Sequence, residues 1–97
     1  MENRLTVAEK CLENTLAYLA FLDGERSDQP VLSFAVLEEA SRAQYPLLGY
    51  GFAPKALSVR DRLQQSSLED SLYRRLLQEK AVIERAVIGY LRMRANR

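Results

Sequence analysis

The chain has 97 residues, of which 47% are hydrophobic and 28% are charged, and its formal net charge is +1. This composition is typical of a globular protein, so we expect a single domain over residues 1–97 and exclude an intrinsically disordered chain. A domain of this size buries only about two thirds of the surface that its unfolded chain would expose. We therefore expect a modest stability, which oligomerisation would raise.

The residue types exclude several kinds of chemistry. Histidine is absent and Cys11 is the only cysteine, so the sequence has no imidazole-based catalytic triad and no zinc or iron–sulfur ligand set. The adjacent acidic residues at 38–39, like those at 69–70, point to different sides of a helix and do not converge on a substrate. We therefore expect a protein that is not an enzyme and that has no catalytic residue, cofactor or metal.

Cys11 and the N-terminal region indicate the compartment. A single cysteine cannot form an intrachain disulfide and suits a reducing environment. Charged residues interrupt the N-terminal region, and its longest charge-free apolar run, residues 15–22, is far shorter than a membrane span. We expect a cytoplasmic protein with no signal peptide and no membrane partner.

A first helix is predicted from about Val7 to Gly24. Thr6 and Glu9 have the spacing of a capping box, in which both side chains satisfy backbone donors at a helix start. From Thr15 onward the helix is apolar on nearly all sides, so we expect its C-terminal half to lie deeper than its N-terminal half. Apolar residues at intervals of three and four form one stripe: Leu5, Ala8, Leu12, Leu16, Leu19 and Leu22.

Residues 25–43 predict a polar loop followed by a helix. Residues 25–29 are polar, and Pro30 suits a first helical turn. On β-branched content alone, residues 31–37 are also compatible with a buried strand. We favour a helix because this stretch continues into residues 38–43, which favour helix, and because no second strand is available to pair with it.

Residues 45–54 break the helical pattern with two prolines and two glycines, and they are rich in aromatic residues. Aromatic side chains in such a loop either fold back to close one end of a bundle or bury a large area at an interface. We keep both possibilities open and take Tyr50 and Phe52 as candidate partner-binding residues.

The remaining sequence predicts a short helix and a long one. The short helix covers about Lys55 to Gln65, with Leu57 and Leu63 as its apolar contacts. A serine at 66 or 67 then caps a final helix, which runs from Leu68 to about Asn96. The apolar stripe of this final helix comprises Leu72, Leu76, Ile83, Ala86, Tyr90 and Met93, widened by Leu68, Val82, Val87 and Leu91.

This final helix is the main reason to expect association. At ~1.5 Å per residue, about 28 residues span ~42 Å, so we expect the shorter helices to leave part of its apolar stripe uncovered. An uncovered stripe needs a partner. Opposite charges four residues apart are expected to pair on its exposed surface: Asp70 with Arg74, Arg75 with Glu79, and Lys80 with Glu84.

The first functional hypothesis is a small all-α bundle of three to four helices, expected to be oligomeric, that acts as a protein–protein interaction module. It would be an adaptor, a regulator or a chaperone, and it would form either a homodimer or a heterodimer with its protein partner. Tyr50 and Phe52 are candidates for a second contact. The candidates for self-association lie on the final helix: Leu76, Ile83, Val87, Tyr90 and Leu91.

The alternative hypothesis is a nucleic-acid-associated accessory protein. Residues 1–52 contain eight acids and four bases, whereas residues 53–97 contain ten bases and five acids. The acidic and basic halves either attract each other, within or between chains, or leave the basic half to an acidic partner. Cations also complement the macrodipole at a helix C-terminus, and no known nucleic-acid-binding motif is present. The arginines that phosphate groups would attract are Arg85, Arg92, Arg94 and Arg97.

Overall fold

A computed structural model describes the chain except for residues 1–2, 44, 46–47, 66–67 and 96–97. In the described residues the regular structure consists of four α-helices and no strand. The expected all-α fold with a long last helix is therefore confirmed. None of these helices is both long and apolar enough to cross a membrane, as judged on the described residues. The helices are α1 (Arg4–Leu22), α2 (Ala35–Arg42), α3 (Phe52–Leu63) and α4 (Asp70–Ala95).

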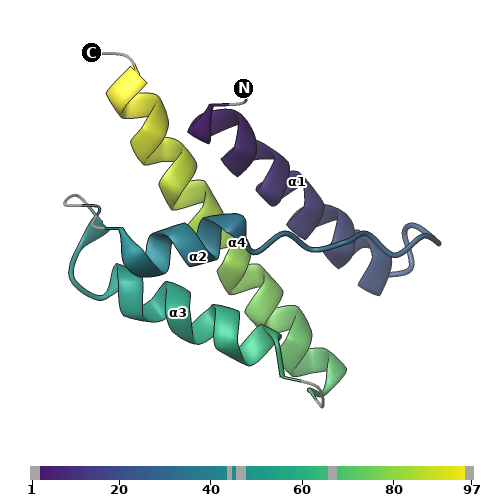
Figure 1. The fold of residues 1–97 in the computed structure, drawn as a ribbon. Helices are drawn as coiled ribbons and strands as arrows, with labels where there is room; N and C mark the ends of the chain where they lie inside the picture. Colours follow the sequence, from purple (N-terminus) through teal and green to yellow (C-terminus); the bar gives the residue numbers. More distant parts are fainter. Residues whose placement is uncertain (1–2, 44, 46–47, 66–67, 96–97) are drawn as a thin grey trace.

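The two longest helices, α1 and α4, pack side by side and antiparallel (Figure 1). Ion pairs fix this register near both ends of α1: the Arg92 guanidinium lies 2.8 Å from the Glu9 carboxylate, and Arg74 pairs with Asp23. The short helices α2 and α3 pack on each other, and both also contact α4. The helix α4 is therefore contacted by all three of the other helices.

The start of α1 differs from the prediction. The side chain of Asn3 accepts a hydrogen bond from the Thr6 backbone N–H at 2.8 Å, so Asn3 is the cap and the capping box of Thr6 and Glu9 is wrong. Asparagine is one of the best N-capping residues, and the helix begins one turn earlier than expected. The end agrees with the prediction, because Gly24 follows the helix with a φ of 78°, a conformation that glycine adopts without strain.

The face that α1 buries matches the predicted apolar stripe only in part, because Ala8 of that stripe is fully buried and its leucines are not. Its fully buried residues are Ala8, Cys11 and Thr15, whereas Leu16 is 40% exposed. The C-terminal half is only partly buried, so the expectation that it lies deeper is wrong. The three buried side chains are small, and four leucines of the predicted stripe pack against the core at partly buried positions: Leu5, Leu12, Leu19 and Leu22.

The connection between α1 and α2 is longer than predicted. The helix α2 begins at Ala35, and Pro30 lies outside it, so the helix expected from residue 31 is wrong for residues 31–34. Val31 is 84% exposed. The Ser33 hydroxyl accepts hydrogen bonds from the Ala35 N–H at 3.4 Å and from the Cys11 thiol at 3.2 Å. A serine that bonds the backbone locally competes with helix formation, which accounts for the late start.

The aromatic residues of 45–54 differ in their burial. Tyr45 is buried, and its ring makes edge-on contacts with Phe52 at 5.7 Å and with Tyr90 at 5.0 Å between centroids. Tyr50 is fully exposed. The helix α3 begins at Phe52 rather than near Lys55, so Phe52 lies in its first turn. Tyr45 and Phe52 thus close this end of the bundle, and Tyr50 stays at the surface.

The apolar contacts predicted for α3 and α4 are partly wrong. On α3, Leu63 is buried as expected, but Leu57 is exposed and the other buried positions are Ala56 and Val59. On α4, Val82 is 58% exposed and Met93 is also exposed. The predicted serine caps at 66 and 67 lie outside the described residues. The buried residues of α4 are Leu76, Leu77, Lys80, Ala81, Ile83, Glu84, Val87 and Ile88.

Three of the five residues of α4 expected to mediate self-association are buried. Leu76, Ile83 and Val87 are at most 2% exposed in a single subunit, because α1, α2 and α3 together cover this stretch of α4. The expectation that part of the apolar stripe of α4 is left uncovered therefore holds for Val82 and Met93, which are exposed. It is wrong for Leu76, Ile83 and Val87. The reason is that three shorter helices share the surface of α4.

Candidate interaction surface

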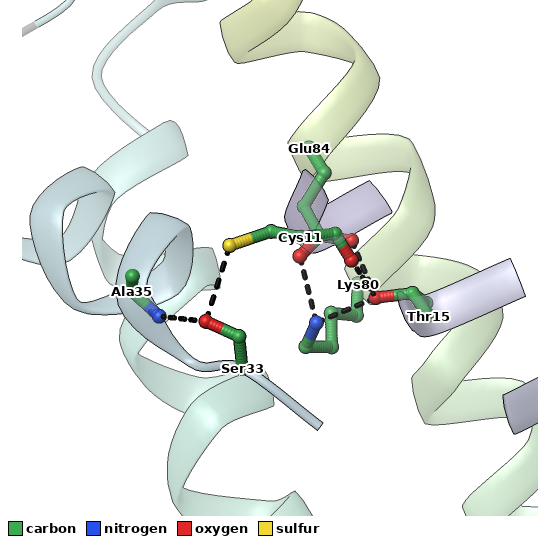
Figure 2. Close-up of polar contacts among 6 residues, drawn as sticks. All are labelled: Cys11, Thr15, Ser33, Ala35, Lys80 and Glu84. Carbon is green, nitrogen blue, oxygen red and sulfur yellow. Dashed lines mark hydrogen bonds and ion pairs between the residues drawn. The ribbon is translucent and has the colours of Figure 1, made fainter. Parts of the chain in front are cut away.

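A buried polar cluster of Thr15, Lys80 and Glu84 joins α1 to α4 (Figure 2). The Lys80 ammonium lies 2.7 Å from Glu84 Oε2 and donates to Thr15 Oγ1 at 2.6 Å. The Thr15 hydroxyl lies 2.7 Å from Glu84 Oε1, and the Cys11 carbonyl oxygen is a second acceptor 3.0 Å away. Lys80 Nζ is also 5.8 Å from the centre of the Phe34 ring. Each member of the cluster is thus bonded within it.

Burial determines the electrostatics of this cluster. Removal from water raises the pKa of Glu84, while the Lys80 ammonium and the Thr15 hydroxyl oppose that rise. In the described part of the chain no buried side-chain nitrogen or oxygen lacks a hydrogen-bond partner. Lys80 and Glu84 pair as their spacing of four predicts, but they pair in the core and not on the surface. A closed and fully bonded cluster of this kind is a structural feature rather than a site for a ligand.

A second polar cluster surrounds Tyr45 at the end of the bundle near the start of α1. The Tyr45 hydroxyl donates to Glu39 Oε1 at 2.7 Å and accepts from Arg4 Nη2 at 3.1 Å. Arg4 and Glu39 also form an ion pair with each other. Burial, reinforced by the Glu39 carboxylate, raises the pKa of Tyr45 to about 12. This cluster attaches α1 and α2 to the aromatic end of the bundle.

A hollow on the surface lies between α1 and α4. It has a volume of about 660 Å³, and we call it the α1/α4 groove. Its apolar part is formed by two leucines of α1 and one isoleucine of α4, while acids of α1 stand on one side and arginines of α4 on the other. The lining residues are Glu9, Leu12, Glu13, Leu16, Arg85, Ile88, Gly89 and Arg92.

The charges of this groove are only partly neutralised within the subunit. Glu9 and Arg92 form the ion pair that crosses it. Among the residues that the structure describes, neither the Glu13 carboxylate nor the Arg85 guanidinium has an ion-pair partner. Gly89 leaves a gap in the α4 wall, because a Cβ built there would meet no atom within 4 Å. The groove therefore offers apolar surface, charge of each sign and a position of close backbone approach.

The residues proposed for partner binding are dispersed in the fold. Tyr90 packs on Tyr45, and Leu91 lines a second hollow of about 160 Å³ between α1, α2 and α4, together with Val87. The sequence prediction missed the groove residues of α1, because it placed Leu16 in the apolar stripe and did not consider Glu13 as a binding residue. Their spacing of three was the available signal, since it places an acid beside an exposed leucine.

Of the four arginines of the nucleic-acid hypothesis, the structure describes three. Arg85 and Arg92 line the α1/α4 groove opposite two acids, whereas the Arg94 guanidinium lies 5.9 Å from the centre of the Tyr90 ring. Arg97 lies outside the described residues.

Comparisons with protein-family models, with curated proteins and with solved structures gave no match. Within residues 3–43, 45, 48–65 and 68–95, no group of three or more acidic or cysteine side chains is placed to hold a metal ion. A proposal about function therefore rests on the surface chemistry of the chain itself.

Proposed function

We propose that the chain is a small non-enzymatic protein–protein interaction module, with an adaptor, regulator or chaperone-like role, that binds its partner in the α1/α4 groove. The observation that carries this proposal is the pairing of apolar surface with charges of both signs in one groove. Protein partners commonly bury such a centre behind a polar rim, whereas small-molecule sites enclose most of the ligand.

The geometry of the groove suits a helical partner. Two antiparallel helices form its walls, and an amphipathic helix laid along them would cover Leu12, Leu16 and Ile88 with its apolar face. The charged rims would then select the orientation of the partner, because a rotated partner would place like charges together.

A non-enzymatic role agrees with the state of the polar groups. The buried polar side chains Lys80, Glu84 and Tyr45 are bonded to other side chains of the fold. We also propose a cytoplasmic location, because the free thiol of Cys11 is buried in the core and suits a reducing compartment.

The nucleic-acid alternative receives less support from this arrangement. A phosphate group approaching Arg85 or Arg92 would also meet the carboxylates of Glu9 and Glu13 on the facing wall. Electrostatic attraction to a polyanion depends on basic groups that are not opposed by acids at short range.

Site-specific photo-crosslinking in the native cell tests the proposed function. A photoreactive phenylalanine analogue in place of Leu16 lies in the groove, and the same replacement of Val31, which is exposed outside the groove, is the control. We expect protein adducts from position 16 and few from position 31. Adducts at neither position, or equal adducts at both, would contradict a binding role for the groove.

A further inference from the structure

We propose that the partner in the α1/α4 groove is a second copy of this chain, so that α1 of each subunit lies against α4 of the other. This inference rests on the proposed interaction function and identifies the partner. The helices α1 and α4 of the two copies would form a four-helix bundle around a two-fold axis parallel to them.

The distribution of charge in the groove carries this inference. Glu9 and Glu13 lie on α1, and Arg85 and Arg92 lie on α4. In a two-fold interface the same surface meets itself, so a self-complementary surface must present both signs. Rotation about an axis parallel to the helices moves α1 of the second copy opposite α4 of the first without changing its level along the helices. The acidic wall formed by α1 of each subunit therefore faces the basic wall formed by α4 of the other subunit, so the dimer contains this contact twice.

The level of the charges agrees with this rotation. Glu9 is level with Arg92, since the two form an ion pair within the subunit, and α1 and α4 run antiparallel. Moving from Glu9 to Glu13 along α1 therefore leads from Arg92 toward Arg85 along α4. Glu13 of one subunit then faces Arg85 of the other, and both charges gain the ion-pair partner that they lack among the described residues of one subunit.

The other two-fold arrangement is unfavourable. An axis across the helices, in the plane of the interface, would bring α1 against α1 and α4 against α4. Glu13 would then approach the acids of the second copy, and Arg85 would approach its arginines. Juxtaposed like charges disfavour an interface, so the charges select the parallel axis.

Gly89 gives an independent indication of close approach. Glycine inside a helix is destabilising by roughly 0.5–1 kcal/mol relative to alanine. Its own subunit has no need of glycine there, because a Cβ would meet nothing within 4 Å, and its backbone does not have a positive φ. A helix from a second copy that crosses α4 at Gly89 would explain the residue, since small side chains let two helix backbones come close.

Charge reversal with mixing tests the proposed dimer. We expect the unmodified chain to dimerise in sedimentation equilibrium, and Glu13→Arg alone or Arg85→Glu alone to weaken dimerisation by about tenfold or more, because each places like charges together. An equimolar mixture of the two variants should restore the dimer. In the mixed dimer the arginine introduced at position 13 of one chain faces the glutamate introduced at position 85 of the other, and the two unmodified side chains also face each other. The double variant should dimerise like the unmodified chain.

A second variant separates association from folding. Gly89→Ala should raise the unfolding midpoint of the dilute monomer, because alanine favours helix and has room in the subunit, yet it should weaken dimerisation. Dimers that persist with either charge reversal, or that the mixture does not restore, would overturn the proposed arrangement. A chain that stays monomeric at all accessible concentrations would overturn the second copy as partner, while photo-crosslinking from position 16 to another protein would still support the interaction function.

Discussion

Lys80 and Glu84 show how a residue pair can keep its partner and yet have a different role from the one that its spacing predicts. On an exposed helix a pair four residues apart contributes only a few tenths of a kcal/mol. In the core of this chain the same two side chains have no exposed surface, and the Thr15 hydroxyl bonds to both of them. Burial makes each charge dependent on its partner, because an unpaired charge in the core is strongly unfavourable.

The pair can be tested by single and double replacement. Lys80→Met leaves the Glu84 carboxylate without its cation, and we expect a loss of about 3–5 kcal/mol in the free energy of unfolding. Since burial already raises the pKa of Glu84, the loss should become smaller as the pH falls and the carboxyl takes up a proton. Urea unfolding followed by circular dichroism measures both effects.

The double variant Lys80→Met/Glu84→Leu is the matched control for this experiment. It removes both charges, and the Thr15 hydroxyl keeps the Cys11 carbonyl as its acceptor. We expect its stability to be equal to that of the unmodified chain within about 1 kcal/mol, or higher. A double variant that is as unstable as Lys80→Met would show that the charges do not depend on each other.

Two tyrosines should make the fold sensitive to alkaline pH. Burial raises the pKa of Tyr45 and that of Tyr73 from the ordinary value of 10.0 to about 12. The folded chain therefore keeps protons that the unfolded chain releases above pH 10, so stability is complete below pH 10 and falls as the pH rises toward 12. For Tyr45 alone the loss by the folded-state pKa is about 2 kcal/mol.

Tyr45→Phe isolates this contribution, because it removes the ionising group and keeps the ring between Phe52 and Tyr90. Denaturation measured below and above pH 10 should show a smaller alkaline loss in the variant than in the unmodified chain. Equal losses in the two proteins would contradict the account of Tyr45.

The sequence predicts the bounds of some helices better than those of others. The positions of α1, α3 and α4 follow from periodicity and from the glycines and prolines between them, and the structure agrees to within a turn at most described ends. The start of α2 was not predictable from periodicity, because Ser33 ends the preceding stretch through bonds to Cys11 and Ala35 that depend on the tertiary fold. The buried face of α1 was missed for a related reason, since the polar Thr15 bonds in the core to Lys80 and Glu84, which only the tertiary fold brings to it.

The role of Asn3 as the N-cap of α1 can be tested by replacement. Asn3→Ala removes the side-chain acceptor for the Thr6 N–H, so we expect a loss of about 1 kcal/mol in stability. Thr6→Ala is the matched control, because Thr6 contributes its backbone N–H and not its side chain to the cap. Thermal unfolding of the two variants measures the difference, and an equal or larger loss from Thr6→Ala would favour the capping box instead.

The whole molecule explains why a long last helix does not by itself reveal an interface. The chain extends over 41 Å in its longest dimension, close to the ~39 Å that a helix of the length of α4 occupies. One subunit covers the middle of α4 with three helices, and this leaves the edge between α1 and α4 as the groove. The association expected from the sequence thus stays a prediction, but its proposed surface moves from Leu76, Ile83 and Val87 to the residues of the groove.

The asymmetry of charge along the sequence also favours contacts between α1 and α4. Residues 1–52 are acidic overall and residues 53–97 are basic overall. Because α1 belongs to the first half and α4 to the second, contacts between these helices, within or between subunits, favour the approach of unlike charges. The sequence alone left open whether this attraction acts within one chain or between chains.

Amide NMR spectra recorded over a dilution series provide the most direct test of the α1/α4 groove as the interaction surface. We predict concentration-dependent shifts at residues 9–16 of α1 and 85–92 of α4, with the amides near Tyr50 and Val31 unchanged. Shifts that gather around Tyr50, or spectra that are identical at every concentration, would contradict self-association through the groove.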